Sequence, residues 1–166
     1  MRRSAVLLAS AAIALGGCTL RPLYAGGGRG QVAQTLRSVA VAPIQGRGGF
    51  LVRTALVDRI GSDDGAARYR LEVELDDRIT GYGIRLDDAV TRERRTLRAR
   101  YRLVDAQLGT VVLDATAGSD AGIDVVGSEY ATVAAEQTAL ERLAVDVADQ
   151  IVARVALFAS RTAPAP

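Results

Sequence analysis

The sequence predicts an α+β fold, a two-layer sandwich in which two helices cover one face of a four-stranded mixed/antiparallel sheet. Three segments alternate apolar and polar residues, which is typical of strands with one buried face. Two other segments repeat apolar residues at the spacing of a helix. The order of elements is β-α-β-β-β-α. Because the sheet and both helices each have one apolar face, both helices are expected on the same face of the sheet.

The first strand and the first helix are expected within residues 39–60. Residues 39–44, V-A-V-A-P-I, form a short apolar strand that Pro43 should end. Residues 50–60 then form a helix, whose apolar stripe consists of Leu51, Val52, Ala55, Leu56 and Ile60. Since a helix connects the first strand to the second, these two strands can pair in parallel.

Three alternating strands follow as a predicted antiparallel meander. Residues 69–75 alternate Tyr, Leu and Val with Arg and Glu, and residues 97–103 alternate Leu, Ala and Tyr with Arg. The last strand is expected at residues 110–117. Residues 76–88 contain Gly81, Gly83 and Asp87-Asp88, which indicates the end of a strand and a turn or long hairpin loop, and the Gly- and Asp-rich residues 118–128 are predicted to be a loop.

A long C-terminal helix is predicted from about Glu129 to Phe158. Its apolar stripe is formed by Leu140, Leu143, Val147, Ile151, Val155 and Phe158. These elements define a single domain at residues 38–160, followed by a disordered tail at residues 161–166. The Gly-rich segment before the domain predicts that residues 18–37 are a flexible tether.

The N-terminus has the pattern of an export signal. Arg2 and Arg3 precede an apolar segment, residues 5–15, which has signal-peptide length and is too short to span a membrane comfortably. The L-G-G-C sequence that ends at Cys18 resembles a bacterial lipobox, in which the Cys is joined to diacylglycerol and becomes the first mature residue. We therefore expect a lipoprotein signal peptide at residues 1–17 and lipidation of Cys18. The alternative is an ordinary secretory signal with an incidental Cys.

The charge composition argues against a nucleic-acid-binding protein. All 21 basic residues are Arg, and there is no His. Without Arg2 and Arg3 of the predicted signal peptide, 19 Arg balance the 19 Asp and Glu. A chain without net charge does not have the basic surface that nucleic acid requires. Any electrostatic function must therefore come from local segregation of charge.

The sequence contains no recognisable catalytic constellation. Without His, the usual general base and the commonest transition-metal ligand are absent. No Ser or Thr has a Lys or His partner, and there is no G-x-S-x-G motif. The adjacent carboxylates Asp76-Asp77 and Asp87-Asp88 are better explained as turn or solvated positions. We therefore expect a protein that is not an enzyme and has no cofactor or metal site.

An unusually Arg-rich segment lies in the third strand and before it. The sequence R-E-R-R-T-L-R-A-R-Y-R, residues 92–102, contains six Arg. Strand geometry makes Arg98, Arg100 and Arg102 project from one face about 7 Å apart. Two interpretations can coexist. The three Arg can form cross-strand ion pairs with Glu72, Glu74 and Asp114, or they can bind the phosphates of a ligand.

The start of the predicted mature chain resembles a known family. C-T-L-R-P-L-Y, beginning at Cys18, is similar to the C-x-x-R-P-L-Y opening of alphaproteobacterial members of the lipopolysaccharide-assembly lipoprotein (LptE) family. The order of predicted elements resembles the family as well. Thr19 follows the Cys where an Asp would indicate retention in the inner membrane under the enteric sorting rule, which favours the outer membrane.

This resemblance implies a location, partners and a ligand. Family members sit as a plug inside a large outer-membrane β-barrel of the lipopolysaccharide translocon, and together they deliver lipopolysaccharide to the outer leaflet. The family is thought to bind lipopolysaccharide through basic residues, which makes Arg98, Arg100 and Arg102 the candidate contacts for its phosphates. We expect a lipid-anchored protein on the periplasmic face of the outer membrane, with no nucleic-acid partner. The alternative is an auxiliary lipoprotein of an envelope lipid (ABC-type) transport system.

Overall fold

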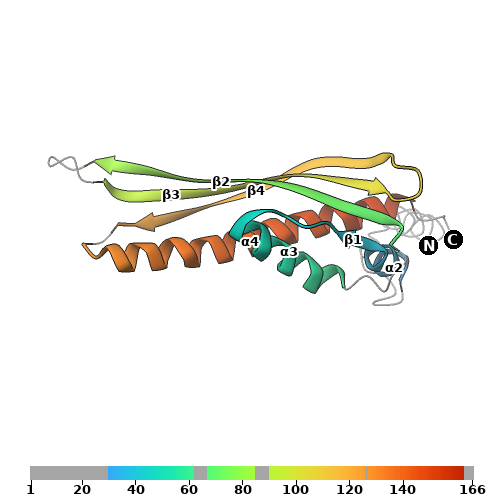
Figure 1. Cartoon of the computed structure of the whole chain (residues 1–166), viewed down its shortest axis with the longest axis horizontal. Helices are drawn as coiled ribbons and strands as arrows, with labels where there is room; N and C mark the ends of the chain where they lie inside the picture. The colour runs from blue at the N-terminus through green and yellow to red at the C-terminus, as the bar shows by residue number, and fades with distance from the viewer. Residues whose placement is uncertain (1–29, 62–66, 85–89, 126, 163–166) are drawn as a thin grey trace, which may run out of the picture.

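The computed structural model describes residues 30–61, 67–84, 90–125 and 127–162. Figure 1 shows an elongated molecule with a sheet in one layer and the helices in the other. The predicted signal peptide, Cys18 and the pair Asp87-Asp88 lie outside the described residues.

The observed elements follow the predicted order, with one short helix added at the start. They are α2 (Gln31–Arg37), β1 (Val39–Val41), α3 (Gly46–Ile60), β2 (Tyr69–Ile84), β3 (Val90–Asp105), β4 (Val111–Asp124) and α4 (Glu129–Thr162). Helix α2 lies in the segment that the sequence analysis assigned to the tether. It buries Val32 and Leu36, so the packed part of the chain begins earlier than expected.

The sheet confirms the predicted fold class. Its strand order is β1-β2-β3-β4. Strand β1 pairs with β2 in parallel, and β2–β3 and β3–β4 are antiparallel. Helices cover one face, which we call the inner face (Figure 1). The side chains on the opposite outer face are mostly polar. The register places Leu71 opposite Leu103 and Glu72 opposite Arg102, so apolar and charged side chains separate onto the two faces.

The predicted loop at residues 118–128 was wrong over most of its length, and the strand expected to end early in residues 76–88 runs on to Ile84. Residues 76–84 belong to β2, and residues 118–124 belong to β4. Gly and Asp are depleted in strands, which is why the sequence favoured loops there. Pairing along almost the whole of β3 supplies the hydrogen bonds that outweigh this preference. Helix α3 also begins four residues earlier than expected, at Gly46.

The hydrophobic core lies between the inner face and the helices. Among its fully buried side chains are Leu56, Leu71, Leu103, Val147 and Ile151. The connection between β1 and α3 passes so close to the first turn of α3 that a Cβ at Gly49 would lie 2.6 Å from the Ile44 carbonyl oxygen. A side chain at this position would therefore clash with the backbone, which favours glycine there.

The two ends of the molecule differ in how the sheet is covered. In the proximal half, α2, α3 and α4 lie beneath it. In the distal half, which we define as residues 78–84, 90–96, 120–124 and 129–139, α4 continues under the strands (Figure 1), and α3 reaches this half with its N-terminal end, where Arg47 Nη2 donates to Gln137 Oε1 at 3.5 Å. No helix within the described ranges is both long enough and apolar enough to cross a membrane.

Candidate functional site: an arginine ladder on the outer face

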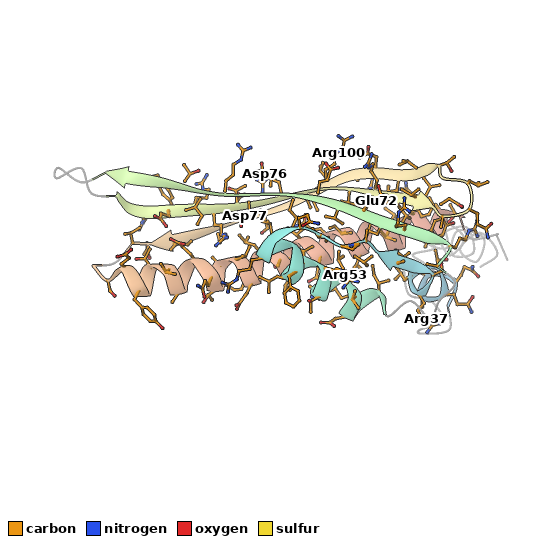
Figure 2. All side chains as sticks on the ribbon, viewed as in Figure 1. Arg37, Arg53, Glu72, Asp76, Asp77 and Arg100 are labelled. Carbon is orange, nitrogen blue, oxygen red and sulfur yellow. The ribbon has the colours of Figure 1, made fainter. Side chains whose placement is uncertain are left out.

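The three candidate ligand contacts lie together on the outer face of β3. Arg98, Arg100 and Arg102 occupy alternate positions of this strand, between β2 and β4. Arg98 and Arg100 are exposed, and Arg102 is half-buried. Figure 2 shows Arg100 standing above the sheet, away from the helices. We call these three residues the arginine ladder. The sequence prediction that they share one face is confirmed.

Carboxylates on the neighbouring strands neutralise two members of the ladder as predicted. Arg100 Nη2 lies 2.9 Å from Asp114 Oδ2, and its Nε also donates to this carboxylate. Arg102 Nη2 lies 3.3 Å from Glu72 Oε2 and 3.8 Å from Glu74 Oε1. The guanidinium of Arg100 holds the pKa of Asp114 below its usual range. Cross-strand pairing therefore accounts for much of the ladder's charge compensation.

Arg98 has a different partner and an additional structural role. Its Nη2 lies 3.1 Å from Asp120 Oδ2, in the segment where sequence analysis expected a loop. The side chain lies across Gly118, where a Cβ would be 2.5 Å from Arg98 Cδ. Nη1 donates to the Ser119 carbonyl oxygen at 3.2 Å. Hydrogen bonds from Thr96 and Arg98 hold the pKa of Asp120 below its usual range.

The outer face also contains Arg94, which has a different environment from the ladder. Its guanidinium carbon lies 5.5 Å from the centre of the Tyr82 ring, within the range of a cation–π interaction. Among the described residues, no carboxylate lies within ion-pair distance of Arg94. An anionic group could therefore bind Arg94 without displacing a carboxylate. From the sequence, Arg94 was only one of the six Arg in residues 92–102 and was not distinguished from its neighbours.

A depression in the outer face accompanies the ladder. It has a volume of about 480 Å³ and is lined by Glu74, Leu75, Asp76, Arg98, Ala99, Arg100 and Thr116. Two Arg and two carboxylates therefore border the same space. The guanidinium groups at this site can donate hydrogen bonds to an anion, but carboxylates of the protein already accept some of those hydrogen bonds.

The adjacent carboxylates Asp76 and Asp77 do not form a joint site. They point to opposite faces of β2 (Figure 2). Asp76 pairs with Arg78 on the outer face. Asp77 accepts hydrogen bonds from Arg95 Nε at 2.9 Å and from Arg95 Nη2 at 2.6 Å on the inner face. Within the part of the chain that the structure describes, no group of acidic or other ligating residues could hold a metal ion.

A small charged cluster on the inner face was not predicted. Arg95 also donates from Nη1 to the Glu136 carbonyl oxygen at 2.9 Å, which ties β3 to α4. Burial and the negative charge of Glu136 raise the pKa of Glu93. Glu93 Oε2 is buried without a hydrogen-bond partner among the described residues. Continued alternation from Leu97 back to Glu93 would have indicated these inward positions.

The chain matches the model of a known protein family. The family described as lipopolysaccharide-assembly (LptE) matches residues 36–155. This chain belongs to the LptE family. The match covers nearly all of the described elements and includes the arginine ladder. No curated protein matches the chain.

Three solved structures that are similar to this LptE-family chain are described as lipoproteins. A putative lipoprotein from Caulobacter crescentus is 26% identical, with a TM-score of 0.65, and the match covers 78% of this chain and 96% of that one. The rare lipoprotein B from Shewanella oneidensis is 11% identical, with a TM-score of 0.59 and coverages of 74% and 95%. A minor lipoprotein from Acinetobacter baumannii is 16% identical, with a TM-score of 0.59 and coverages of 73% and 92%. The last two similarities show the fold alone.

Proposed function

We propose that this protein is an outer-membrane lipoprotein, anchored through Cys18, that plugs a lipopolysaccharide-translocating β-barrel and helps deliver lipopolysaccharide to the outer leaflet. The family match over residues 36–155 is the observation that carries this proposal. LptE proteins are a non-enzymatic lipopolysaccharide-assembly family, in keeping with the absence of a recognisable catalytic constellation from the sequence.

The surface of the sheet supports a position inside a polar barrel lumen. The outer face carries alternating Arg and carboxylate side chains, most of them exposed. The interior of a large outer-membrane barrel is polar and hydrated. A flat domain with charged groups held in place on a strand can form hydrogen bonds with such a wall without placing apolar surface in water.

The arginine ladder can bind phosphate while its ion pairs remain intact. A guanidinium has five N–H donors. Arg100 directs Nε and Nη2 to Asp114, which leaves donors on Nη1 and one on Nη2. We propose that Arg98, Arg100 and Arg102 bind lipopolysaccharide phosphates through such remaining donors. The same Arg side chains would then both form ion pairs with carboxylates of the sheet and bind phosphate.

Binding of purified lipopolysaccharide to the purified mature chain tests the ladder. The double variant Arg100→Gln/Arg102→Gln removes two guanidinium groups and is expected to weaken binding by about tenfold, since hydrogen bonds to charged groups are stronger than neutral ones. Arg98 is left unchanged because its side chain also lies across Gly118 and donates to the backbone of β4. The matched control, Arg53→Gln/Arg161→Gln, removes the same charge from exposed helix positions. Equal losses in both variants would contradict a specific site on the ladder.

Purification from membranes tests the partner. The detergent-extracted lipoprotein is expected to co-elute with an outer-membrane β-barrel of the lipopolysaccharide translocon. Co-elution with an inner-membrane permease complex would instead support the ABC-type lipid transport system, and would overturn the proposed plug.

A further inference from the structure

The edge strand β4 forms two backbone hydrogen bonds with the amide side chain of Gln150, like those it would form with a neighbouring strand. The Gly118 N–H donates to Gln150 Oε1 at 3.1 Å, and Gln150 Nε2 donates to the Gly118 carbonyl oxygen at 3.1 Å. A residue of a paired strand would make the same two hydrogen bonds. Gln150, which comes from α4, therefore occupies one position of an edge that could otherwise accept a strand.

The same edge is open beyond Gly118, in the distal half. The β3–β4 register is regular from Gly118 to Asp124. Because the backbone groups of alternate residues in an antiparallel strand point the same way, those of Asp120, Gly122 and Asp124 also point away from β3. All three residues are exposed. Among the described residues, none hydrogen-bonds to their outward backbone groups, so this stretch is an unprotected sheet edge.

A groove runs beside this open edge. It has a volume of about 580 Å³ and lies between β4 and α4. Ala121 and Leu143 provide small and apolar surface, and Val145 is 41% exposed at the groove. Side chains of a strand added to β4 would alternate between the outer face and this groove. The groove thus offers space for the inward-facing half of such a strand.

The charges around the edge define what kind of strand fits. Asp120, Glu141 and Asp146 line the groove, with Arg142 as the basic residue among them. On the outer face, Asp120 and Asp124 are flanked by Arg98 and Arg92 of β3 on one side only. An added strand with basic residues would flank these carboxylates on the other side.

A second copy of this chain is a poor occupant. Antiparallel pairing of two β4 edges centred on Gly122 would place Asp120 opposite Asp124 in both halves of the contact. Like charges directly opposite each other destabilise paired strands. Charge complementarity therefore favours a different, basic polypeptide.

We propose that the edge of β4 at residues 120–124 binds an extended segment of a partner protein as a fifth strand of the sheet. The segment alternates basic side chains, which lie on the outer face beside Asp120 and Asp124, with apolar side chains, which enter the groove. This strand addition goes beyond the proposed function, because it needs only a partner segment with this alternation. It depends neither on the barrel nor on bound lipopolysaccharide. Gln150 ends the docking site on its proximal side.

A peptide copied from β3 is a suitable probe, because β3 already has the required alternation. The capped peptide T-L-R-A-R-Y-R-L reproduces residues 96–103. Amide hydrogen exchange is measured by NMR on the isotope-labelled mature chain, with and without the peptide. The amides of Asp120, Gly122 and Asp124 are expected to exchange about tenfold more slowly with saturating peptide. The amides of Ala121 and Ile123, which face β3, should be protected in both samples.

Three results would overturn the proposal. The first is unchanged exchange of the Asp120, Gly122 and Asp124 amides at saturating peptide. The second is faster exchange at Ala121 and Ile123, which would mean that the peptide displaces β3. The third is protection of the edge amides that needs no peptide and increases with protein concentration, because the occupant would then be a second copy.

Two variants separate edge pairing from general charge attraction. Gly122→Pro removes one outward N–H and leaves the β3 ladder intact, and a side chain fits there because its Cβ would meet only the Tyr82 hydroxyl, at 3.7 Å. This variant is expected to abolish peptide protection. Glu141→Arg should raise the peptide's Kd by about threefold, whereas the matched change Asp58→Arg on α3 should leave it unchanged. Undiminished binding to Gly122→Pro, or equal effects of the two charge reversals, would overturn the proposal.

Discussion

The proximal and distal halves of this molecule share three strands and one long helix, yet different interactions hold the two halves together. In the proximal half, side chains such as Leu56, Leu103 and Ile151 are completely enclosed between the sheet and the helices. In the distal half, inward-facing positions of β3 include the charged residues Glu93 and Arg95. The first half is stabilised mainly by apolar burial, and the second depends more on paired charges.

This difference separates the part of the chain that fixes the fold from the part that offers surfaces for partners. Apolar burial is strong and independent of direction, so the proximal core can hold the sheet in place. The distal half is covered mainly by α4 and has an open β4 edge and the exposed Arg94. Regions with few buried contacts open more easily and are the ones that rearrange on binding.

Truncation of a proximal core residue should have the largest effect on stability. Leu103 is fully buried under the helices, and Leu103→Ala is expected to lower the free energy of unfolding by about 2–5 kcal/mol. Ile123 is 4% exposed in the distal half, where mainly α4 covers the sheet, and Ile123→Ala should cost less. Urea denaturation of the mature chain measures both. A larger loss for Ile123→Ala would show that the proximal core is not the main source of stability.

Loss of the charge on Asp77 should lower the free energy of unfolding by an intermediate amount. Asp77→Asn weakens both hydrogen bonds from Arg95, whose side chain is only 13% exposed. The expected loss in the free energy of unfolding is about 1–3 kcal/mol, because a partly buried guanidinium would lack its charged partner. The matched variant Asp114→Asn weakens a similar pair on the exposed outer face, where solvent screens the charges, and should cost less.

Added salt distinguishes these two pairs further. The stability difference between Asp114→Asn and the wild type should shrink as salt increases, whereas that of Asp77→Asn should persist. If the two variants lose equal stability and respond equally to salt, the ion pair on the inner face of the distal half has no special role.

The sequence revealed the proximal half better than the distal half, for a physical reason. Strict alternation in residues 97–103 predicted both the strand and the common face of the arginine ladder, because burial of one face imposes a period of two. Residues 118–124 lack that signal. Arg98 of the neighbouring strand lies across Gly118, where a Cβ would clash, so the glycine reflects a long-range contact that leaves no local pattern. The ion pair between Arg98 and Asp120 was missed for the same reason.

Helix α2 and the charged inner cluster were missed for related reasons. α2 has only seven residues and two buried side chains, too few to show a helical period. The pair Arg95–Asp77 depends on both strands continuing beyond the predicted loop. Sequence patterns thus predicted the elements that bury apolar surface, but not those whose partners lie on another strand.

The smallest expected effect on stability concerns Glu93. Its pH dependence has the opposite sign to that of Asp114, a carboxylate paired with Arg. Because burial and Glu136 raise the pKa of Glu93, the folded chain holds this proton more tightly than the unfolded chain. The contribution of Glu93 to stability is therefore complete below the usual pKa of Glu and is lost as the pH rises through the raised value. Asp114 has the opposite dependence, because Arg100 lowers its pKa and its contribution is lost as the pH falls.

Glu93→Gln should accordingly stabilise the protein at about pH 7 and have little effect near pH 4, where the wild-type side chain is mostly protonated in the folded state. The uncharged amide avoids burial of a negative charge beside Glu136. Urea denaturation at both pH values measures the difference, with Glu141→Gln on the exposed side of α4 as the matched control for the loss of one carboxylate. A variant that is less stable than the wild type at both pH values would mean that the Glu93 carboxylate is satisfied in the folded state, and that charge is not what limits the stability of the distal half.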